Sequence, residues 1–482
     1  MPATIVLAQE PNNVFDMAYG PNPITLSGIT SYEDKYVLRV FDGGSTPIAD
    51  IRQTPNQYGK AIFDLQNILQ SHVAPPDYDI DDIGVGPGQP NSIRDSSTEG
   101  FHYTLSIGYE AGGQVTIMPT GYGYYTVYGG SKQYFEVPFY AGEYQSKVSS
   151  DDSFPACTQV DRVGKALTDV KWLMGPAETG DNIQNYITIN QNIAVRDVYT
   201  DDHTTVSWFQ ELERAGGTNT KVRGIEAWKI FWVNGNTVLN GGTPTTIVNS
   251  TSYSGGPNSN IGDGFSIPNT LKAITLATGP YNLPGSTNIP AGTTHYYVVP
   301  VAWTPLACAQ DCDPQTQVGL DCQELMQVQR FNIVDAKCND FDHMQFSWYN
   351  SLGFKDYFTF TKRVDHRTNT SRNNYLKEAA DFNGQSWSVD ERQRGYTTYS
   401  SKIEDTYTVT SGYMNDDQAK LLQSMFQSPE VKVRMEGYGN NHIWRPINIL
   451  SATYDEKTNR KDRLFQYTVT FKLAHNIKAQ RG

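Results

Sequence analysis

The chain has few charged residues, few cysteines and no long apolar run. Charged residues make up 18% of its 482 positions, and five cysteines are too few for the disulfide framework of small secreted domains. No run of about 18 apolar residues occurs, so the sequence predicts no membrane-spanning helix. Residues 1–10 carry no positive charge and only a short apolar run, which predicts no secretory signal. We therefore expect synthesis and retention in the cytoplasm.

The motifs of well-known catalytic sites are also missing. The sequence has no Gly-x-Ser-x-Gly turn, no His-Glu-x-x-His motif and no Gly-x-x-x-x-Gly-Lys phosphate loop. Gly84-Val-Gly-Pro-Gly88 places a proline where a dinucleotide-binding helix would begin. His343 and His442 are candidate bases, but nothing pairs either with a nucleophile. We predict a protein without enzymatic activity, while glycosidase-type paired carboxylates, whose separation depends on the fold, stay open.

Positive charge is scarce and scattered. The net charge is −13 and no compact Lys/Arg run occurs, which argues against a surface devoted to duplex nucleic acid. We expect neither a membrane partner nor sequence-specific nucleic-acid binding. A negative surface that lines a channel for passing DNA stays open.

The residues that are abundant favour short strands and turns. Thirty Tyr, 41 Gly and 25 Pro indicate a mainly β protein, because aromatic residues suit pleated surfaces while Gly and Pro end strands. The length exceeds what one core supports, so several domains are expected. A hydrophobic fraction of 38% is low for a compact enzyme and suits a component of an assembly. The fold class we predict is mainly β and multi-domain, with immunoglobulin-like β-sandwich modules and short helices.

Shifts in composition divide the chain into four parts. The expected parts are a β module at 1–149 with an exposed acidic loop at 74–99, a β module at 150–306 with an Asn/Gly/Ser-rich loop at 240–269, a cysteine-containing linker at 307–340, and a β module with one helix at 341–482. Asn234-Gly235 predicts a hairpin in the second module. Helices are predicted after Asp64, with Leu65, Ile68 and Leu69 on one face, and after Asn415-Asp-Asp-Gln418, with Leu421, Leu422, Met425 and Phe426 on one face.

The aromatic segment from Phe346 to Phe360 predicts a β-hairpin with one buried face. Trp348 and Phe358 are expected to anchor the core of the last module. This segment, with its Trp-Asn-x-x-Gly-like turn and Tyr357-Phe-Thr-Phe360 strand, resembles one that recurs in tail and neck proteins of tailed phages infecting Bacteroidota, the crAss-like phages among them.

Both ends of the chain share this resemblance. The opening is similar to the N-terminal immunoglobulin-like module of these proteins, through Pro11-Asn12, Asn22-Pro23, Pro55-Asn56, Gly59 and Phe63-Asp64. At the other end, Tyr467-Thr-Val-Thr-Phe471 precedes a short polar end with Gln480-Arg481. The resemblance implies a structural protein of the virion, in the tail, neck ring or baseplate. It further implies assembly in the host bacterial cytoplasm, with a homo-oligomeric ring and other tail or neck proteins as partners.

Two clusters are candidate binding sites. Cys308, Cys312, Cys322 and Cys338 are candidate ligands of a tetrahedral zinc; disulfides formed after release, or reduced cysteines that only pack, are the alternatives. Tyr122, Tyr124, Tyr125, Tyr128 and Tyr134 are a candidate aromatic platform for glycan or protein contact, with packing in a strand core as the alternative. The rival functions are therefore a carbohydrate- or receptor-binding adhesin and a glycoside-cleaving tail enzyme.

Overall fold

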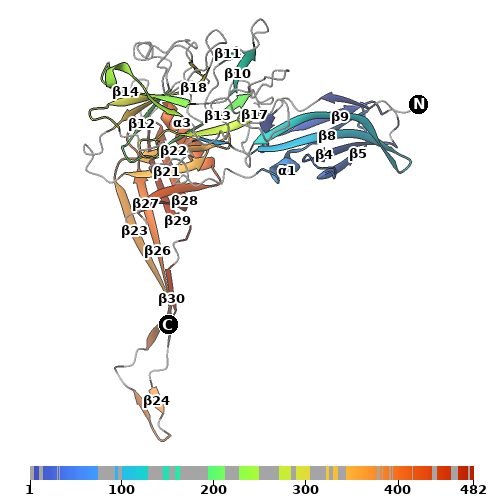
Figure 1. Ribbon diagram of the computed structural model, residues 1–482. Helices are drawn as coiled ribbons and strands as arrows, with labels where there is room; N and C mark the ends of the chain where they lie inside the picture. Colours follow the sequence, from blue (N-terminus) through green and yellow to red (C-terminus); the bar gives the residue numbers. More distant parts are fainter. Residues whose placement is uncertain are drawn as a thin grey trace. The chain divides into compact units, whose positions relative to one another are not determined.

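The computed structural model of the chain describes residues 5–9, 15–29, 31, 33–73, 93–95, 100–128, 145–150, 158–162, 194–211, 227–248, 271–283, 289–303, 322–324, 329–334, 343–376, 380–382, 384–389, 392, 395–414, 416–436, 442–456, 465–475 and 478–481. These residues form mostly β-strands (Figure 1). The chain divides into two compact units, Met1–Ala336 with Tyr349–Tyr357, and Lys337–Trp348 with Phe358–Gly482. The predicted mainly β, multi-domain class is confirmed, while the finer boundaries stay predictions.

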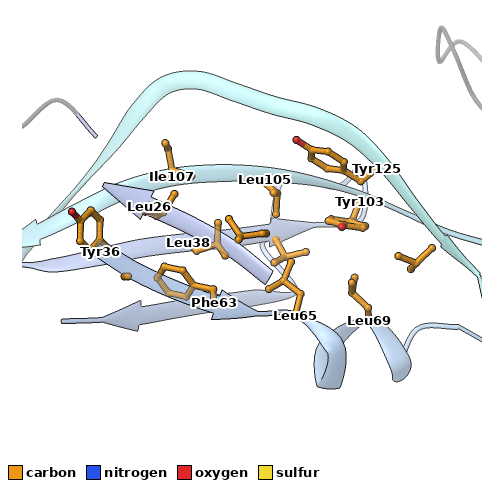
Figure 2. Packing of buried hydrophobic residues seen from close by; sticks show 14 of the residues in the cluster. Leu26, Tyr36, Leu38, Phe63, Leu65, Leu69, Tyr103, Leu105, Ile107 and Tyr125 are labelled. Atoms are coloured by element: carbon orange, nitrogen blue, oxygen red, sulfur yellow. The ribbon is translucent and has the colours of Figure 1, made fainter. Parts of the chain in front are cut away.

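The N-terminal part of the first unit is a β-sandwich. One sheet has the order β1-β3-β6 and the other β2-β9-β8-β4-β5. Their strands are β1 (Val6–Gln9), β2 (Phe15–Met17), β3 (Pro23–Ser27), β4 (Lys35–Phe41), β5 (Ala49–Gln53), β6 (Lys60–Asp64), β8 (Gly100–Ala111) and β9 (Gln114–Tyr128). Alternate residues of both sheets meet in one buried cluster, as Figure 2 shows for Leu26, Leu38 and Leu105. The sandwich predicted for this end of the chain is therefore present.

Helix α1 (Gln66–Gln70) closes one end of this core. Leu65, which precedes the helix, and Leu69 within it are fully buried in the cluster, where Figure 2 shows them beside each other. The Asp64 carboxylate accepts hydrogen bonds from the backbone N–H groups of Gln66 and Asn22, both at 3.0 Å. It thus satisfies one of the donors that the first helical turn leaves free, although the N-cap position itself is occupied by Leu65 and not by Asp64.

The rest of the described first unit forms two further sheets. The first, in the order β11-β10-β13-β17-β7, contains β7 (Ile93–Asp95), β10 (Gln145–Ser150), β11 (Thr158–Arg162), β13 (Thr205–Glu211) and β17 (Leu271–Ala277). The second, in the order β12-β20-β18-β14-β15 with β16 on β14 and β19 on β18, contains β12 (Ala194–Val198), β14 (Ala227–Asn234), β15 (Thr237–Val238), β16 (Thr245–Val248), β18 (His295–Trp303), β19 (Cys322–Glu324) and β20 (Gln329–Ile333). A short 3-10 helix, η4, spans Asn240–Gly242.

Two sequence predictions fall within these sheets. β14 and β15 form the hairpin expected at Asn234-Gly235, with Asn234 opposite Thr237, and Gly235 takes the positive φ of 58° that the turn requires. Ile93–Asp95, inside the segment expected to be an exposed acidic loop, is a strand paired with β17. The other residues of that segment, 74–92 and 96–99, lie outside the described residues.

The second unit is organised around an eight-stranded sheet in the order β22-β21-β27-β28-β29-β26-β23, with β30 on β26. Its strands are β21 (Met344–Tyr349), β22 (Lys355–Phe360), β23 (Val364–Leu376), β26 (Tyr396–Thr410), β27 (Val431–Glu436), β28 (His442–Glu456), β29 (Phe465–Leu473) and β30 (Lys478–Arg481). A separate two-stranded sheet consists of β24 (Ala380–Phe382) and β25 (Trp387–Val389).

Helix α3 (Asp416–Gln427) packs on this sheet through the face predicted from the sequence. Leu422 and Met425 are fully buried, whereas Phe426 is half-buried. Tyr467 of β29 donates a hydrogen bond from its hydroxyl to the Ala419 carbonyl at 3.2 Å. The helix therefore covers the sheet with its apolar side. Among the described residues, no helix has the length and apolar character needed to cross a bilayer.

The aromatic hairpin forms, but its anchors differ in part from the expected ones. Phe346, Trp348 and Phe360 are buried, and the Trp348 indole N–H donates to Ser424 Oγ of α3 at 2.8 Å. Phe358 was expected in the core and is only half-buried. Side chains alternate along a strand, so Phe358 and Phe360 share a face; Phe360 meets Phe346 at 4.8 Å between ring centroids, deeper in the core.

Candidate functional site

A two-stranded ribbon of the second unit, formed by β23 and β26 and called the arm below, is the candidate interaction surface. Thirteen residue pairs join its strands, from Val364 opposite Val409 to Leu376 opposite Tyr396. Figure 1 shows the ribbon, in orange, extending away from the sheet, with β24 beyond its far end. The described residues of β24 and β25 follow the arm along the chain and are called the arm tip.

Neither face of the distal arm is covered. Every residue of β23 from Asp365 to Leu376 is exposed. Because successive side chains of a strand point to opposite faces, exposure of consecutive residues means that both faces meet solvent. β30 adds a third strand along Ser400–Ile403, and beyond it, among the described strands, Asn374–Leu376 pairs only with Tyr396–Thr398. A two-stranded end of this kind is only marginally stable in water without further packing. The arm therefore has a surface to offer on each side.

Polar contacts between the strands take the place of a core in the arm. Thr368 Oγ1 donates to Asp405 Oδ1 at 2.8 Å, and Thr398 Oγ1 donates to Asn374 Oδ1 at 2.7 Å. Near the sheet, the His366 ring stacks on Tyr407 with centroids 4.5 Å apart. The Thr398–Asn374 bond is exposed and stabilises weakly, since water competes for the same groups, whereas the Thr368–Asp405 bond is partly buried.

Large apolar side chains gather at the distal end of the arm and its tip. They are exposed over 47% to 73% of their surface: Tyr375, Leu376, Phe382, Trp387, Tyr396 and Tyr399. Tyr375 and Tyr399 lie 6.2 Å apart between ring centroids, and Phe382 and Trp387 lie 5.3 Å apart. Exposed apolar groups that cluster in this way are typical of protein interaction sites.

The two strands of the arm are neutral overall, with three Lys or Arg and three Asp or Glu, and the acidic residues lie toward the sheet. The stretches Thr370–Leu376, Tyr396–Ile403 and Lys478–Arg481, the last of which pairs with β26 as β30, contain four Lys or Arg residues and no Asp or Glu. Arg372 is exposed, and Lys402 forms an ion pair with Glu404, whose pKa this lysine lowers. Arg and aromatic residues together are the composition that interface cores favour.

The sequence-predicted zinc site lies mostly outside the described residues. Cys308, Cys312 and Cys338 are not among them, and Cys322 begins β19 opposite Trp303 of β18. Within the described part of the chain, no three His, Cys, Asp or Glu side chains come together as a metal site would require. Zinc binding by the four cysteines stays a prediction.

The predicted tyrosine platform is described at one of its members. Tyr125 is buried in the sandwich core and lies near Tyr103 (Figure 2). The ring centroids of the two side chains are 5.4 Å apart. Packing therefore explains Tyr125, and the side chains of its four companions lie outside the description. His343 is half-buried, and His442 begins β28.

A buried polar group in the first unit has a structural role. The Arg196 guanidinium lies 3.5 Å from the Asp356 carboxylate, which also accepts a hydrogen bond from Asn350 Nδ2 at 2.9 Å. Burial lowers the pKa of Arg196 and Asp356 raises it, yet arginine stays charged in proteins. Asn350 in turn accepts bonds from the N–H groups of Leu352 and Phe354, which holds the hairpin turn together.

The arm was missed at the sequence level. Thr368 to Asn374 reads Thr-Asn-Thr-Ser-Arg-Asn-Asn, with no apolar residue to reveal a strand period. A signal was nevertheless available, because residues 354–383 contain no Gly or Pro to end a strand.

Comparisons with known proteins give distant structural likeness. No protein-family model and no curated protein matches the chain. Among solved structures, the tail of an empty gene transfer agent particle with C6 symmetry contains a chain that is 11% identical to this one. The match covers 25% of this chain and 81% of that chain, with a TM-score of 0.15. A protein of the native gene transfer agent virion is 10% identical, and the match covers 26% of this chain and 88% of that chain with a TM-score of 0.16. The chicken CNTN1 FN1–FN3 domains share 10% identity and 66% of each chain, at 0.13. At such scores the likeness carries no argument.

Proposed function

We propose that this chain is a structural protein of a tailed-phage virion, located in the tail, neck ring or baseplate. It acts through interfaces with copies of itself and with other virion proteins, and it has no catalytic role. The observation that carries the proposal is the arm, a ribbon with both faces exposed and aromatic side chains at its end. Covering these aromatic side chains would gain the free energy of apolar burial.

The sequence resemblance at both ends of the chain supports the choice of virion over other assemblies. The low hydrophobic fraction of 38% agrees with it, because a chain that completes its packing against neighbours needs less core of its own. The proposed place of assembly is the host bacterial cytoplasm, and the proposed partners are the chain itself and neighbouring tail or neck proteins.

A receptor-binding role is the second candidate, and one observation favours it. Phe382 and Trp387 pair at the arm tip with 57% and 61% of their surfaces exposed, an arrangement that also suits a flat ligand such as a sugar ring. In the structural role a virion protein covers these aromatic residues, whereas in the receptor-binding role a sugar ring does.

Imaging of purified particles separates these candidates. We expect the chain in closed rings, with each copy burying more than about 1,000 Å² against neighbours and the arm inside that interface. Arms that project into solvent, together with binding of the purified protein to a glycan array that Trp387→Ala abolishes, would replace the structural role with the receptor-binding one. Turnover of surface polysaccharide would instead contradict the absence of catalysis.

A further inference from the structure

The outer edge of β23 is an open sheet edge. On one side β23 pairs with β26, and within the described part of the chain no strand pairs with its other side. The far edge of β26 differs, because β30 pairs with Ser400–Ile403 and β29 with Tyr407–Thr410. At 13 residues, β23 is also more than twice as long as any other strand that ends a described sheet. The arm therefore offers one long edge for pairing.

This edge carries none of the features that commonly protect an edge strand. Residues 364–376 contain no proline and no lysine, and every residue from Asp365 to Leu376 is exposed. The one irregularity of the arm ladder, between Asn373 and Asn374, places the extra residue, Tyr399, on β26, so β23 runs without a bulge. An unprotected edge is a template on which another strand can pair through its backbone.

We propose that β23 of one copy pairs antiparallel with β23 of a second copy, about a two-fold axis at Thr370. The contact joins two arms into one sheet, in which the two β23 strands are adjacent and each β26 lies outside them. This inference rests on the proposed structural role and names the edge through which two copies meet. The two arm strands carry equal numbers of basic and acidic residues, so two arms approach without net repulsion between these strands.

Two-fold symmetry restricts the register of this contact. An axis perpendicular to the sheet keeps each side chain on its own face, and opposite residues of an antiparallel pair share a face. Opposite residues must therefore be an even number of positions apart, and one residue must face its own copy. Of the registers that meet this condition, the one centred on Thr370 is the one that pairs all 13 residues of β23.

The side chains of β23 are complementary to themselves in this register, which is why a second copy is the partner. Apolar residues face apolar ones and charged residues face uncharged polar ones: Val364 with Leu376, Asp365 with Tyr375, Arg367 with Asn373, and Arg372 with Thr368. Leu376, now 68% exposed, gains an apolar neighbour, and the Tyr375 hydroxyl can donate to the Asp365 carboxylate. A parallel pair in register would instead place each arginine against its own copy, which is destabilising.

Disulfide cross-linking of the full-length protein tests the register. Thr370→Cys places two thiols opposite each other, where Cα atoms lie about 4.5–5.5 Å apart, within the range that a disulfide spans. Thr368→Cys makes the same change on the same exposed face, but its two thiols lie four residues apart along the strands, about 13 Å. We expect mild oxidation to link the first variant at position 370 and the second about tenfold less or not at all. A mixture of Thr368→Cys and Arg372→Cys should link. Wild type, with its five cysteines, and mapping of the linked peptides are the controls.

Lysine substitutions test the contact itself. Thr370→Lys opposes two lysines at the axis, whereas Thr398→Lys adds the same charge at an exposed position of β26, away from the paired edge. Self-association is measured by sedimentation velocity over a concentration series. We expect wild type to dimerise, Thr370→Lys to lose about tenfold or more in association constant, and Thr398→Lys to stay within about twofold of wild type.

Several results would overturn this contact. Linkage at position 368 and not at 370 would show another register, and equal weakening by both lysine variants would show general repulsion. In particles that carry Thr370→Cys, linkage of this position to a different virion protein would assign the edge to that protein. Closed rings without linkage at position 370 would refute the β23 contact and leave the structural role intact, whereas absence of the chain from particles would refute the structural role itself.

Discussion

The β8–β9 hairpin of the sandwich and the arm are built alike but differ in what their side chains meet. Each joins two long antiparallel strands, of 12 and 15 residues in the hairpin and of 13 and 15 in the arm. In β8, Tyr103, Leu105 and Ile107 are buried in the core, whereas β23 is exposed from Asp365 onward. The backbone ladder is common to both. Burial of alternate side chains is what turns such a ladder into part of a fold.

The difference has an energetic meaning. Full burial of one leucine stabilises a fold by about 1.5–3 kcal/mol, and the sandwich does this many times over, while the distal arm does not. The arm is tied to the unit at its near end, where Tyr407 stacks on Phe471 at 5.4 Å between ring centroids. We therefore assign the arm to the part of the molecule with low local stability, which is the part that a binding partner can order.

Tryptophan provides the sharpest matched pair for this comparison. Trp348 is buried beside α3, and Trp387 is 61% exposed at the arm tip. We expect Trp348→Ala to lower the free energy of unfolding by about 3–5 kcal/mol, because it leaves a large cavity and removes the hydrogen bond from the indole N–H to Ser424 Oγ. Trp387→Ala should change it by less than about 0.5 kcal/mol. Denaturant unfolding of the full chain measures both, and similar losses for the two variants would show that the arm tip is packed.

Leucine repeats the comparison inside strands. Leu38 of β4 is fully buried in the sandwich core, whereas Leu376 of β23 is 68% exposed. Leu38→Ala should lower the free energy of unfolding by about 2–5 kcal/mol and Leu376→Ala by less than about 0.5 kcal/mol. Thermal melting of each variant checks this. A stable Leu38→Ala protein would mean that the sandwich core collapses around the missing side chain.

Elements could be predicted from the sequence where burial of one face gives the apolar residues a regular spacing. The helix at Asp416–Gln427, the hairpin after Asn234 and the core position of Trp348 were predicted because apolar spacing or turn chemistry reported them.

The arm could not be predicted for the same physical reason. Its first strand, Val364–Leu376, buries neither face, so no alternation marks it. The wrong assignment of Phe358 has a related cause, because Phe358 and Phe360 share one face and sequence spacing cannot tell which lies deeper. The candidate surface was therefore hidden by the exposure that makes it available to a partner.

A Tyr→Phe substitution removes a hydroxyl group and leaves the ring in place, so it tests hydrogen bonding rather than the loss of side-chain volume. The Tyr36 hydroxyl donates to the Gly59 carbonyl at 2.5 Å and accepts from the Ile29 N–H at 2.9 Å, and burial raises the pKa of this phenol. Tyr36→Phe should cost about 1–3 kcal/mol, since it leaves two buried backbone groups without a partner. The matched Tyr396→Phe, at a side chain that is 73% exposed, should be neutral within about 0.5 kcal/mol. Equal melting temperatures for both variants would indicate that water replaces the Tyr36 hydroxyl.

Protonation of His295, a buried residue of β18 in the first unit, gives the smallest expected effect on stability. Burial, with a contribution from Arg330, lowers the pKa of His295 to about 4 from its ordinary value near 6.5. Above pH 6.5 the group is neutral in both states and has no effect. As the pH falls from 6.5 towards 4, His295 becomes protonated in the unfolded chain but stays neutral in the folded chain, so the free energy of unfolding decreases. Below about pH 4 His295 is protonated in both states and the loss is complete. Between pH 7 and 5.5 this amounts to about 1 kcal/mol. Unfolding of wild type and His295→Gln across this range should show a shallower acid slope for the variant, and parallel curves would mean that His295 is protonated in the fold.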